Sequence, residues 1–332
     1  MKRNGHQLLP IFFISVALTF AQTEKKEQYQ LIGTILQDDG KPFRGVTPII
    51  FLEGVTVPLA VHTLVDRAGK FKFKNLIPGM FTLVAYIPRA GEKMQTVEVS
   101  RSLADKNGRI FLDIVFQRNV TSTSLNEIST VELSIPSKAK KEYSKSREKL
   151  AKQDVQGAIA HLKKAVEFAP QFSDAWNKLG TLAYQAGDYA LAESYFRSAL
   201  KHDPDYYPSL VNLGGALLSQ HRIQEALPLN LEAVKARPDD ALAQSQLGLN
   251  YFFLKKFDEA ENYLKRAEIL DPGHFSYPQL VLAEIYLLRK DDASLARELK
   301  QFLRFHPDAE QAATIQKRLA EVLLRLPSDK SP

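Results

Sequence analysis

The fold is decided by residues 173–204, SDAWNKLGTLAYQAGDYALAESYFRSALKHDP, because their pattern recurs along the chain. Equivalent prolines stand 34 residues apart, and one more follows after 35 residues: Pro170, Pro204, Pro238, Pro272 and Pro307. Two series of alanines keep the same 34-residue interval: Ala158, Ala192, Ala226 and Ala260, and Ala165, Ala199, Ala233 and Ala267. This period is the length of one helix–turn–helix unit, which must stack on its neighbours to bury its apolar face. The sequence therefore predicts an array of helix pairs.

Units of this length begin at Ala139, Ser173, Tyr207, Ala241 and Phe275, and they resemble tetratricopeptide repeats. The second unit carries the family pattern most fully, at Trp176, Leu179, Gly180, Gly187, Tyr189, Ala192, Phe196, Ala199 and Pro204. The resemblance implies an α-solenoid of five repeats over residues 139–308, strongest over 173–272. The first unit departs from the pattern, and we expect a polar helix whose inward stripe is Tyr143, Ser146 and Leu150. Pro228 should bend or shorten its helix, and residues 309–326 should form a C-terminal capping helix.

The first 21 residues have the three-part layout of a secretory signal peptide. Lys2 and Arg3 precede an apolar run over residues 8–20, and Ala21 ends a small-residue cleavage pattern. Because the run has 13 residues, it is too short for a bilayer that needs about 20. We expect export and a mature chain that begins at Gln22; the alternative is an uncleaved anchor or a buried helix.

Residues 28–118 change to short apolar runs separated by turns, which predicts a seven-stranded β-sandwich. The expected strands are 30–36, 46–52, 59–64, 70–74, 81–86, 95–99 and 109–116. Strict alternation over 70–74 places Phe71 and Phe73 on one face and the lysines in water. Residues 119–138, which begin with a run rich in Ser and Thr, are expected to link this domain to the helices.

Three segments of the predicted sandwich carry a second resemblance: Gly33-Thr34-Ile35, Asp66-Arg67-Ala68-Gly69-Lys70-Phe71 and Leu76-Ile77-Pro78-Gly79. They are similar to the carboxypeptidase regulatory-like domain, which implies a transthyretin-like sandwich related to carbohydrate-binding-like folds. The pairing of such a domain with tetratricopeptide repeats resembles bacterial envelope proteins. Sugar binding would require exposed aromatic side chains beside polar groups. Tyr86 and Phe111 are the candidates, although we favour core packing for both.

Composition excludes several functions. The formal charge of +6 is small and dispersed, so nucleic acid is not an expected partner. The absence of cysteine removes disulfides and thiolate metal sites. The chain has no phosphate-binding loop, nucleophile elbow or histidine pair at metal-ligand spacing. We therefore expect no catalytic residues, no cofactor and no metal, and we predict that the protein is not an enzyme; an envelope enzyme or enzyme subunit is the remaining rival.

In the tetratricopeptide family, the first helix of each repeat lines a concave groove. One position of these helices forms an apolar ladder: Tyr184, Leu218, Phe252 and Tyr286. The neighbouring groove positions are Arg147, Asn177, Thr181, Asn212, Ser245, Phe253 and Gln279. We interpret this set as a groove for an extended or helical peptide; the alternative is that the ladder packs between repeats. Tetratricopeptide clamps for acidic chain ends require lysine, arginine and asparagine at set groove positions. Such a clamp is not supported, because Tyr143 and Arg147 stand where the first pair belongs and Pro208 replaces a later basic residue.

A basic stripe marks one face of the first helix: Lys138, Lys141, Lys145, Lys149 and Lys152. We interpret it as a solvated cap; the alternative is a site for an acidic partner or lipid headgroups.

The sequence thus predicts an exported, non-enzymatic scaffold for a protein or peptide partner. It would be periplasmic, envelope-associated or extracellular, with no membrane span after signal cleavage. The alternative is a carbohydrate-binding accessory protein that acts through the β-sandwich.

Overall fold

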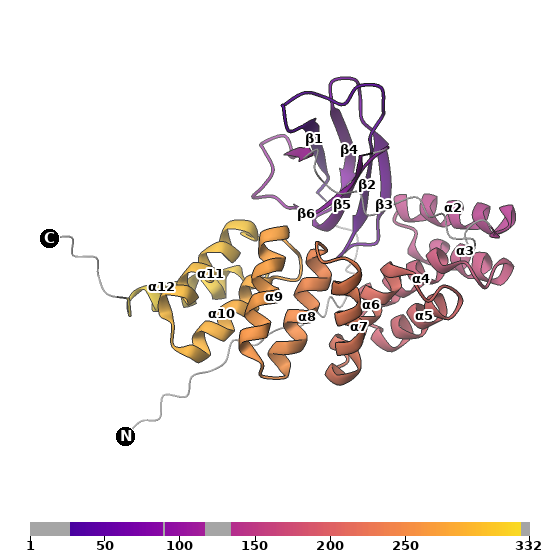
Figure 1. Ribbon diagram of the computed structural model, residues 1–332. Coiled ribbons are helices and arrows are strands. Elements are labelled where there is room, and N and C mark those ends of the chain that lie inside the picture. Colours follow the sequence, from indigo (N-terminus) through magenta and orange to yellow (C-terminus); the bar gives the residue numbers. More distant parts are fainter. Residues whose placement is uncertain (1–26, 89, 117–133, 327–332) are drawn as a thin grey trace. The chain divides into compact units, whose positions relative to one another are not determined.

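The computed structural model describes residues 27–88, 90–116 and 134–326 (Figure 1). The predicted signal peptide and most of the predicted linker lie outside these residues. The chain divides into two compact units, one that ends at Ala216 and one that begins at Leu217. The first unit holds the β-strands and the first helices, and the second unit holds the remaining helices.

The predicted β-sandwich is present, with seven strands in two sheets. The strands are β1 (Tyr29–Gln37), β2 (Ile49–Gly54), β3 (Ala60–Leu64), β4 (Lys70–Leu76), β5 (Gly79–Ile87), β6 (Gly91–Val99) and β7 (Arg109–Phe116). One sheet has the order β4-β1-β7, with β1 and β7 parallel, and the other has the antiparallel order β3-β2-β5-β6. The fold class predicted from the sequence is therefore confirmed for this domain.

Alternation along the strands builds the core of the sandwich. In β4 the buried residues Phe71 and Phe73 alternate with exposed lysines, as predicted. Leu31, Ile50 and Phe81 from three other strands are fully buried in the same apolar cluster. The outward residues of β7 stay exposed, because one face of such a sheet can remain in water.

Helix pairs follow the sandwich, as the 34-residue period predicts. In the first unit they are α2 (Ser137–Ala151), α3 (Val155–Phe168), α4 (Ser173–Gln185), α5 (Tyr189–His202) and most of α6 (Tyr207–Ser219). In the second unit they are α7 (Ile223–Ala236), α8 (Ala241–Phe253), α9 (Phe257–Leu270), α10 (Pro278–Arg289), α11 (Asp292–Phe305) and α12 (Ala312–Leu323).

The terminal helices have the polar and amphipathic character that was expected of caps. In α2, Ser146 and Leu150 are buried and Tyr143 packs on Phe172 with its ring 5.0 Å away. In α12, Ile315 and Val322 are buried against the second unit's apolar cluster. The expected shortening of α7 at Pro228 does not occur, since α7 spans 14 residues like the other second helices α3, α5 and α9.

Small residues allow the two helices of a repeat to approach closely. A Cβ on Gly180 would stand 2.4 Å from the ring of Phe196, and one on Gly248 would stand 2.6 Å from Leu264. Such distances leave no room for a methyl group. Packing therefore requires glycine at both of these positions.

The turn between the two helices of each repeat uses one left-handed residue. Gly187 adopts φ of +80°, and the equivalent residues Gln153, His221, Lys255 and Lys290 adopt φ between 57° and 61°. Non-glycine residues enter this region at a cost of about 1 kcal/mol or more. The turn geometry is thus retained even where glycine is absent.

The last repeat is shifted by one residue. Trp176 and Gln244 each bond the carbonyl of the proline six residues earlier, whereas Gln279 bonds Pro272, seven residues earlier. The extra residue is absorbed in the loop before α10, where Tyr277 adopts φ of 52°. Gln279, and not Pro278, therefore takes the place of Trp176. As a consequence, Tyr286 corresponds to Tyr251 and lies outside the ladder.

Candidate interaction groove

Five predicted groove residues lie in the first unit, and all are half-buried: Arg147 on α2, Asn177, Thr181 and Tyr184 on α4, and Asn212 on α6. The Oδ1 atom of Asn177 accepts hydrogen bonds from Asn212 Nδ2 at 2.9 Å and from Ser209 Oγ at 3.1 Å. Thr181 donates to the Asn177 carbonyl within its own helix. These amides join the first helices of two successive repeats.

The turn between β2 and β3 contacts this same face of α4. The Nζ atom of Lys178 lies 2.7 Å from the Glu53 carboxylate, and the Lys178 side chain is only 11% exposed. The Nε2 atom of Gln185 donates to the Gly54 carbonyl at 2.8 Å and to the Val55 carbonyl at 3.0 Å. An acidic side chain and two adjacent carbonyls are thus held by two side chains of one helix, seven residues apart.

The sandwich itself fixes the shape of this turn. Gly54 N donates to the Leu59 carbonyl at 2.8 Å, and Val55 N donates to the Met80 carbonyl at 2.8 Å. The Thr56 hydroxyl accepts from Met80 N at 2.9 Å. Because the turn's own amides are satisfied inside the sandwich, its carbonyls and Glu53 project as a preformed group of acceptors.

Basic and phenolic groups surround the contact. An Arg147 guanidinium nitrogen lies 3.2 Å from His62 Nδ1 on β3. Lys178 is the main cause that lowers the pKa of Glu53 below its ordinary value. Burial raises the pKa of both Tyr143 and Tyr206, and nearby carboxylates add to the effect. The lowered pKa keeps the Glu53 side chain anionic, and the raised pKa values keep the phenol groups of Tyr143 and Tyr206 neutral.

The contact is polar and small. Ion pairs with an exposed partner contribute about 0.2–1 kcal/mol, and neutral hydrogen bonds about 0.5–1.5 kcal/mol each. Ala60 of β3 is the sandwich residue that joins the apolar cluster of α2 and α3. Contacts of this kind hold two domains together without making them one core.

The predicted groove residues of the second unit are more deeply packed. Leu218 and Ser245 are buried, and Ser245 Oγ accepts from Ser276 Oγ at 2.7 Å. Phe252 and Phe253 are half-buried, with ring centroids 5.8 Å apart. Phe252 also lies 5.8 Å from Phe257, and in the first unit Tyr184 lies 5.0 Å from Tyr189. The half-buried ladder aromatics thus pack against the second helix of their own repeat.

Gln279 and Tyr286 lie inside the last repeat because of its one-residue shift. Gln279 is fully buried and holds the Pro272 carbonyl at 2.7 Å. Tyr286 is 3% exposed, and its hydroxyl donates to Glu261 at 2.7 Å. The aromatic groove positions left partly exposed in the second unit are Phe252 and Phe253.

The basic stripe on α2 is partly neutralised by neighbours. Lys145 pairs with Glu142 at 2.6 Å, and Lys149 pairs with Asp154 at 2.8 Å. Lys138 lies 3.8 Å from the centre of the Phe168 ring. These contacts favour the interpretation of the stripe as a solvated cap over an anion-binding site.

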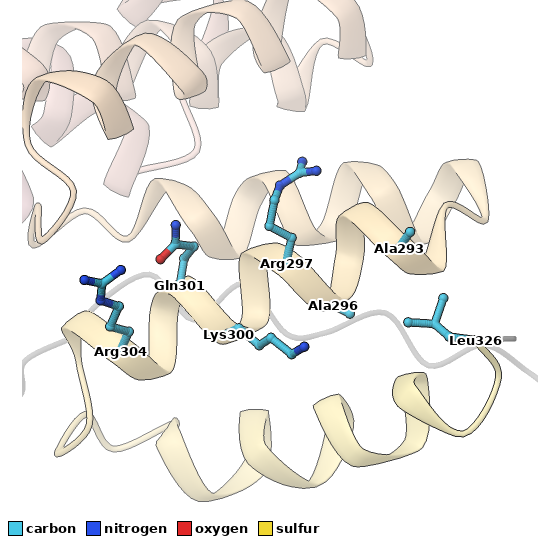
Figure 2. A pocket seen from close by; sticks show the side chains of 7 residues that line it. All are labelled: Ala293, Ala296, Arg297, Lys300, Gln301, Arg304 and Leu326. Carbon is cyan, nitrogen blue, oxygen red and sulfur yellow. The ribbon is translucent and has the colours of Figure 1, made fainter. Parts of the chain in front are cut away.

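A separate hollow of about 410 Å³ runs along α11 (Figure 2). It is lined by Ala293, Ala296, Arg297, Lys300, Gln301, Arg304 and Leu326. Arg297 pairs with Glu298 at 2.9 Å, and Arg304 lies against Phe305. The lining holds surface cations over alanines and no buried polar side chain, so we assign no ligand to it.

The described residues contain no cluster of three or more His, Asp or Glu side chains that could hold a metal ion. Across the same residues, no helix is long and apolar enough to cross a membrane.

The predicted groove residues include Arg147 but not Lys178, Gln185 or Glu53, which form the contact between the turn and α4. Lys178 and Gln185 lie beside the groove positions named above, and Glu53 lies on a different domain. Spacing within the repeats gives no information about which part of the sandwich faces α4. A signal was present in Glu53-Gly54, an acidic residue followed by glycine at the end of a predicted strand.

Comparison with known proteins identifies the repeats. The model of the tetratricopeptide repeat family matches residues 143–207, 177–241 and 211–275. Residues 143–275 are therefore tetratricopeptide repeats, which confirms the first resemblance over this stretch.

Two known proteins are similar to part of this chain. The chain is 28% identical over 158 residues to BBSome complex member BBS4 of Bos taurus, covering 48% of this chain and 30% of that protein. It is 29% identical over 144 residues to type IV pilus assembly protein PilF of Pseudomonas aeruginosa, covering 43% of this chain and 56% of that protein. The matched stretches thus span less than two thirds of these relatives.

Two solved structures are similar to part of the chain. A PilF structure from Pseudomonas aeruginosa aligns with a TM-score of 0.49 and 24% identity, covering 56% of this chain and 84% of that one. MamA from Desulfovibrio magneticus RS-1 aligns with a TM-score of 0.47 and 22% identity, covering 53% of this chain and 99% of that one. Neither likeness carries a functional conclusion.

A buried carboxyl group, Glu298, beside the half-buried Glu268 gives the stability of the second unit a pH dependence. Burial, followed by the charge of Glu268, raises the pKa of Glu298 from 4.5 to about 7, and Arg297 opposes the shift. Folded Glu298 therefore keeps a proton that the unfolded chain releases above pH 4.5. The stability this proton provides is present at low pH and is lost as the pH rises toward 7.

We expect Glu298→Gln to raise the free energy of unfolding at pH 8 by about 1–3 kcal/mol, because a tenfold change in proton affinity is about 1.4 kcal/mol. Thermal and denaturant unfolding at pH 5 and pH 8 would measure this, with Glu321→Gln on α12 as the exposed control. Equal stability of Glu298→Gln and the parent at pH 8 would contradict the assignment.

Proposed function

We propose that the protein is a protein-interaction scaffold whose partner segment binds along the first helices of its tetratricopeptide repeats. The observation that carries the proposal is the face of α4, where Lys178 and Gln185 hold a carboxylate and two main-chain carbonyls of another part of the chain. When an extended peptide is recognised, hydrogen bonds to its main chain supply affinity and contacts to its side chains supply specificity.

The chemistry of the second unit supports the same proposal. Phe252 and Phe253 remain half-buried on α8, and aromatic side chains are frequent anchors at protein interfaces. The relatives named above include a BBSome complex member and a pilus assembly protein, so related repeats occur in assemblies.

Partner capture should depend on the ladder aromatics. After cross-linking in the source cells and mass spectrometry identify a partner, Tyr184→Ser and Phe252→Ser should each weaken its capture about tenfold or more, since loss of an aromatic anchor costs about 2 kcal/mol. Ile269→Ser, which removes a 71% exposed apolar side chain from α9, should leave capture unchanged. Unchanged capture by both ladder variants, with helicity intact by circular dichroism, would contradict binding of the partner in the proposed groove.

We further propose that the protein is exported and acts in the periplasm, in the cell envelope or outside the cell. The support is the basic, apolar and small-residue layout of residues 1–21, together with a chain that needs no disulfide to fold. The resemblance of residues 29–100 to carboxypeptidase regulatory-like domains points the same way.

N-terminal sequencing of the protein from its source cells should find Gln22 as the first residue, because Ala21 ends the expected cleavage pattern. Ala21→Phe should block processing, since signal peptidase requires a small side chain there. A mature protein that retains Met1 would overturn the export proposal.

One observation favours a second candidate function, carbohydrate binding by the sandwich. Phe111 on β7 is 63% exposed, contrary to the core packing favoured from the sequence. Arg109 lies 5.7 Å from the centre of its ring, and Thr34 bonds Asp113 beside it. An exposed ring flanked by hydroxyl, carboxylate and guanidinium groups is the arrangement on which a sugar can stack.

A glycan array with the full chain tests this candidate. We expect at least one glycan to bind and Phe111→Ala to reduce that signal about tenfold, because the ring supplies the stacking surface. Val115→Ala, which trims another exposed apolar residue of β7, is the matched control. An array with no bound glycan would remove the candidate.

A further inference from the structure

We infer that the β2–β3 turn is a tethered ligand of the repeats: Glu53, Gly54 and Val55 occupy the α2–α4 end of the groove and must leave before an acidic partner segment can bind there. The inference deepens the proposed function and rests on it for the external partner. The contact itself lies within one chain, so it can be tested without any partner.

The groove offers donors that match this turn. Lys178 and Gln185 are 11% and 6% exposed, so the positive charge and the amide are largely withdrawn from water. Buried donors require acceptors, and Glu53 with the two carbonyls supplies them. Arg147 adds a second cation, which lies next to His62. The fitting ligand is thus a carboxylate followed by two free main-chain carbonyls.

The turn leaves one group of the groove unsatisfied. Gln185 Oε1 is buried and has no hydrogen-bond partner among the described residues. The turn cannot fill this need with Gly54 N or Val55 N, because both already donate to main-chain carbonyls of the sandwich. An extended peptide that presents a carboxylate, two carbonyls and one free N–H would satisfy the groove more completely. The turn is therefore a replaceable ligand.

The turn can leave the groove without unfolding either partner. Its own hydrogen bonds run to Leu59 and Met80 within the sandwich, and they persist when the helices are released. Apart from Ala60, the apolar cluster beside the contact consists of residues from Ile135 onward. Undocking therefore breaks an ion pair and a few hydrogen bonds, and it exposes little apolar surface.

The first experiment measures docking in the full chain. Because the protein has no cysteine, Val55→Cys introduces a single thiol at the contact, and its maleimide labelling rate reports how often the turn is open. In this background Glu53→Lys and Lys178→Glu should each raise the labelling rate about tenfold, and the double exchange should return it to within about threefold of the parent. Lys164→Glu on α3 is the exposed control and should change nothing.

Equal labelling of the parent and both single variants would overturn the inference, as would a double exchange that labels as fast as the single variants. Circular dichroism and thermal unfolding would verify that each variant is folded. This outcome would leave partner binding elsewhere on the repeats untouched, so the failure of the inference is distinguishable from failure of the proposed function.

The second experiment tests whether the turn is replaceable. A cyclised peptide that carries residues 52–57 should accelerate labelling of Val55→Cys when present at about 10 mM, the range needed to compete with a tethered ligand. The same peptide with lysine in place of glutamate should have no effect. An inert glutamate peptide would show that the turn is a fixed structural contact, which would overturn the ligand interpretation.

Discussion

Close approach between the two helices of each repeat is the constraint on which the helical part depends. Two alanine series recur at 34-residue intervals in the second helices, and all eight residues have no exposed surface: Ala158, Ala165, Ala192, Ala199, Ala226, Ala233, Ala260 and Ala267. A larger side chain at any of these positions would force the helices apart. The alanines therefore fix the pairing, and the pairing determines which side chains of each first helix face the proposed groove.

The same constraint explains which side chains of α4 are available to contact other parts of the chain. Packing of the helix pair uses one face of α4, through Leu179, Gly180 and Leu182, and leaves Lys178 and Gln185 to meet other parts of the chain. The sandwich brings a rigid, acceptor-rich turn to those two side chains. The sandwich thus contacts the repeats within the same unit.

The extent to which the molecule could be predicted differs between its parts. The seven strands follow from the alternation of apolar and polar residues, and the helix pairs follow from the 34-residue period. Both patterns can be read directly along the sequence. An unchanged 34-residue period past Pro272 predicts Tyr286 and Gln279 in the groove, whereas one extra residue in a loop moves both into the core. The Glu53–Lys178 pair joins residues 125 positions apart, and no periodicity encodes such a contact.

Site-specific photocross-linking in the source cells tests the central claim most directly, namely that partners bind on the first helices of the repeats. A photoreactive residue at Phe253 should give a discrete adduct with a partner protein, and the same residue at Ile269, exposed on the second helix α9, should give none. Adducts at Ile269 in the absence of adducts at Phe253 would contradict the account.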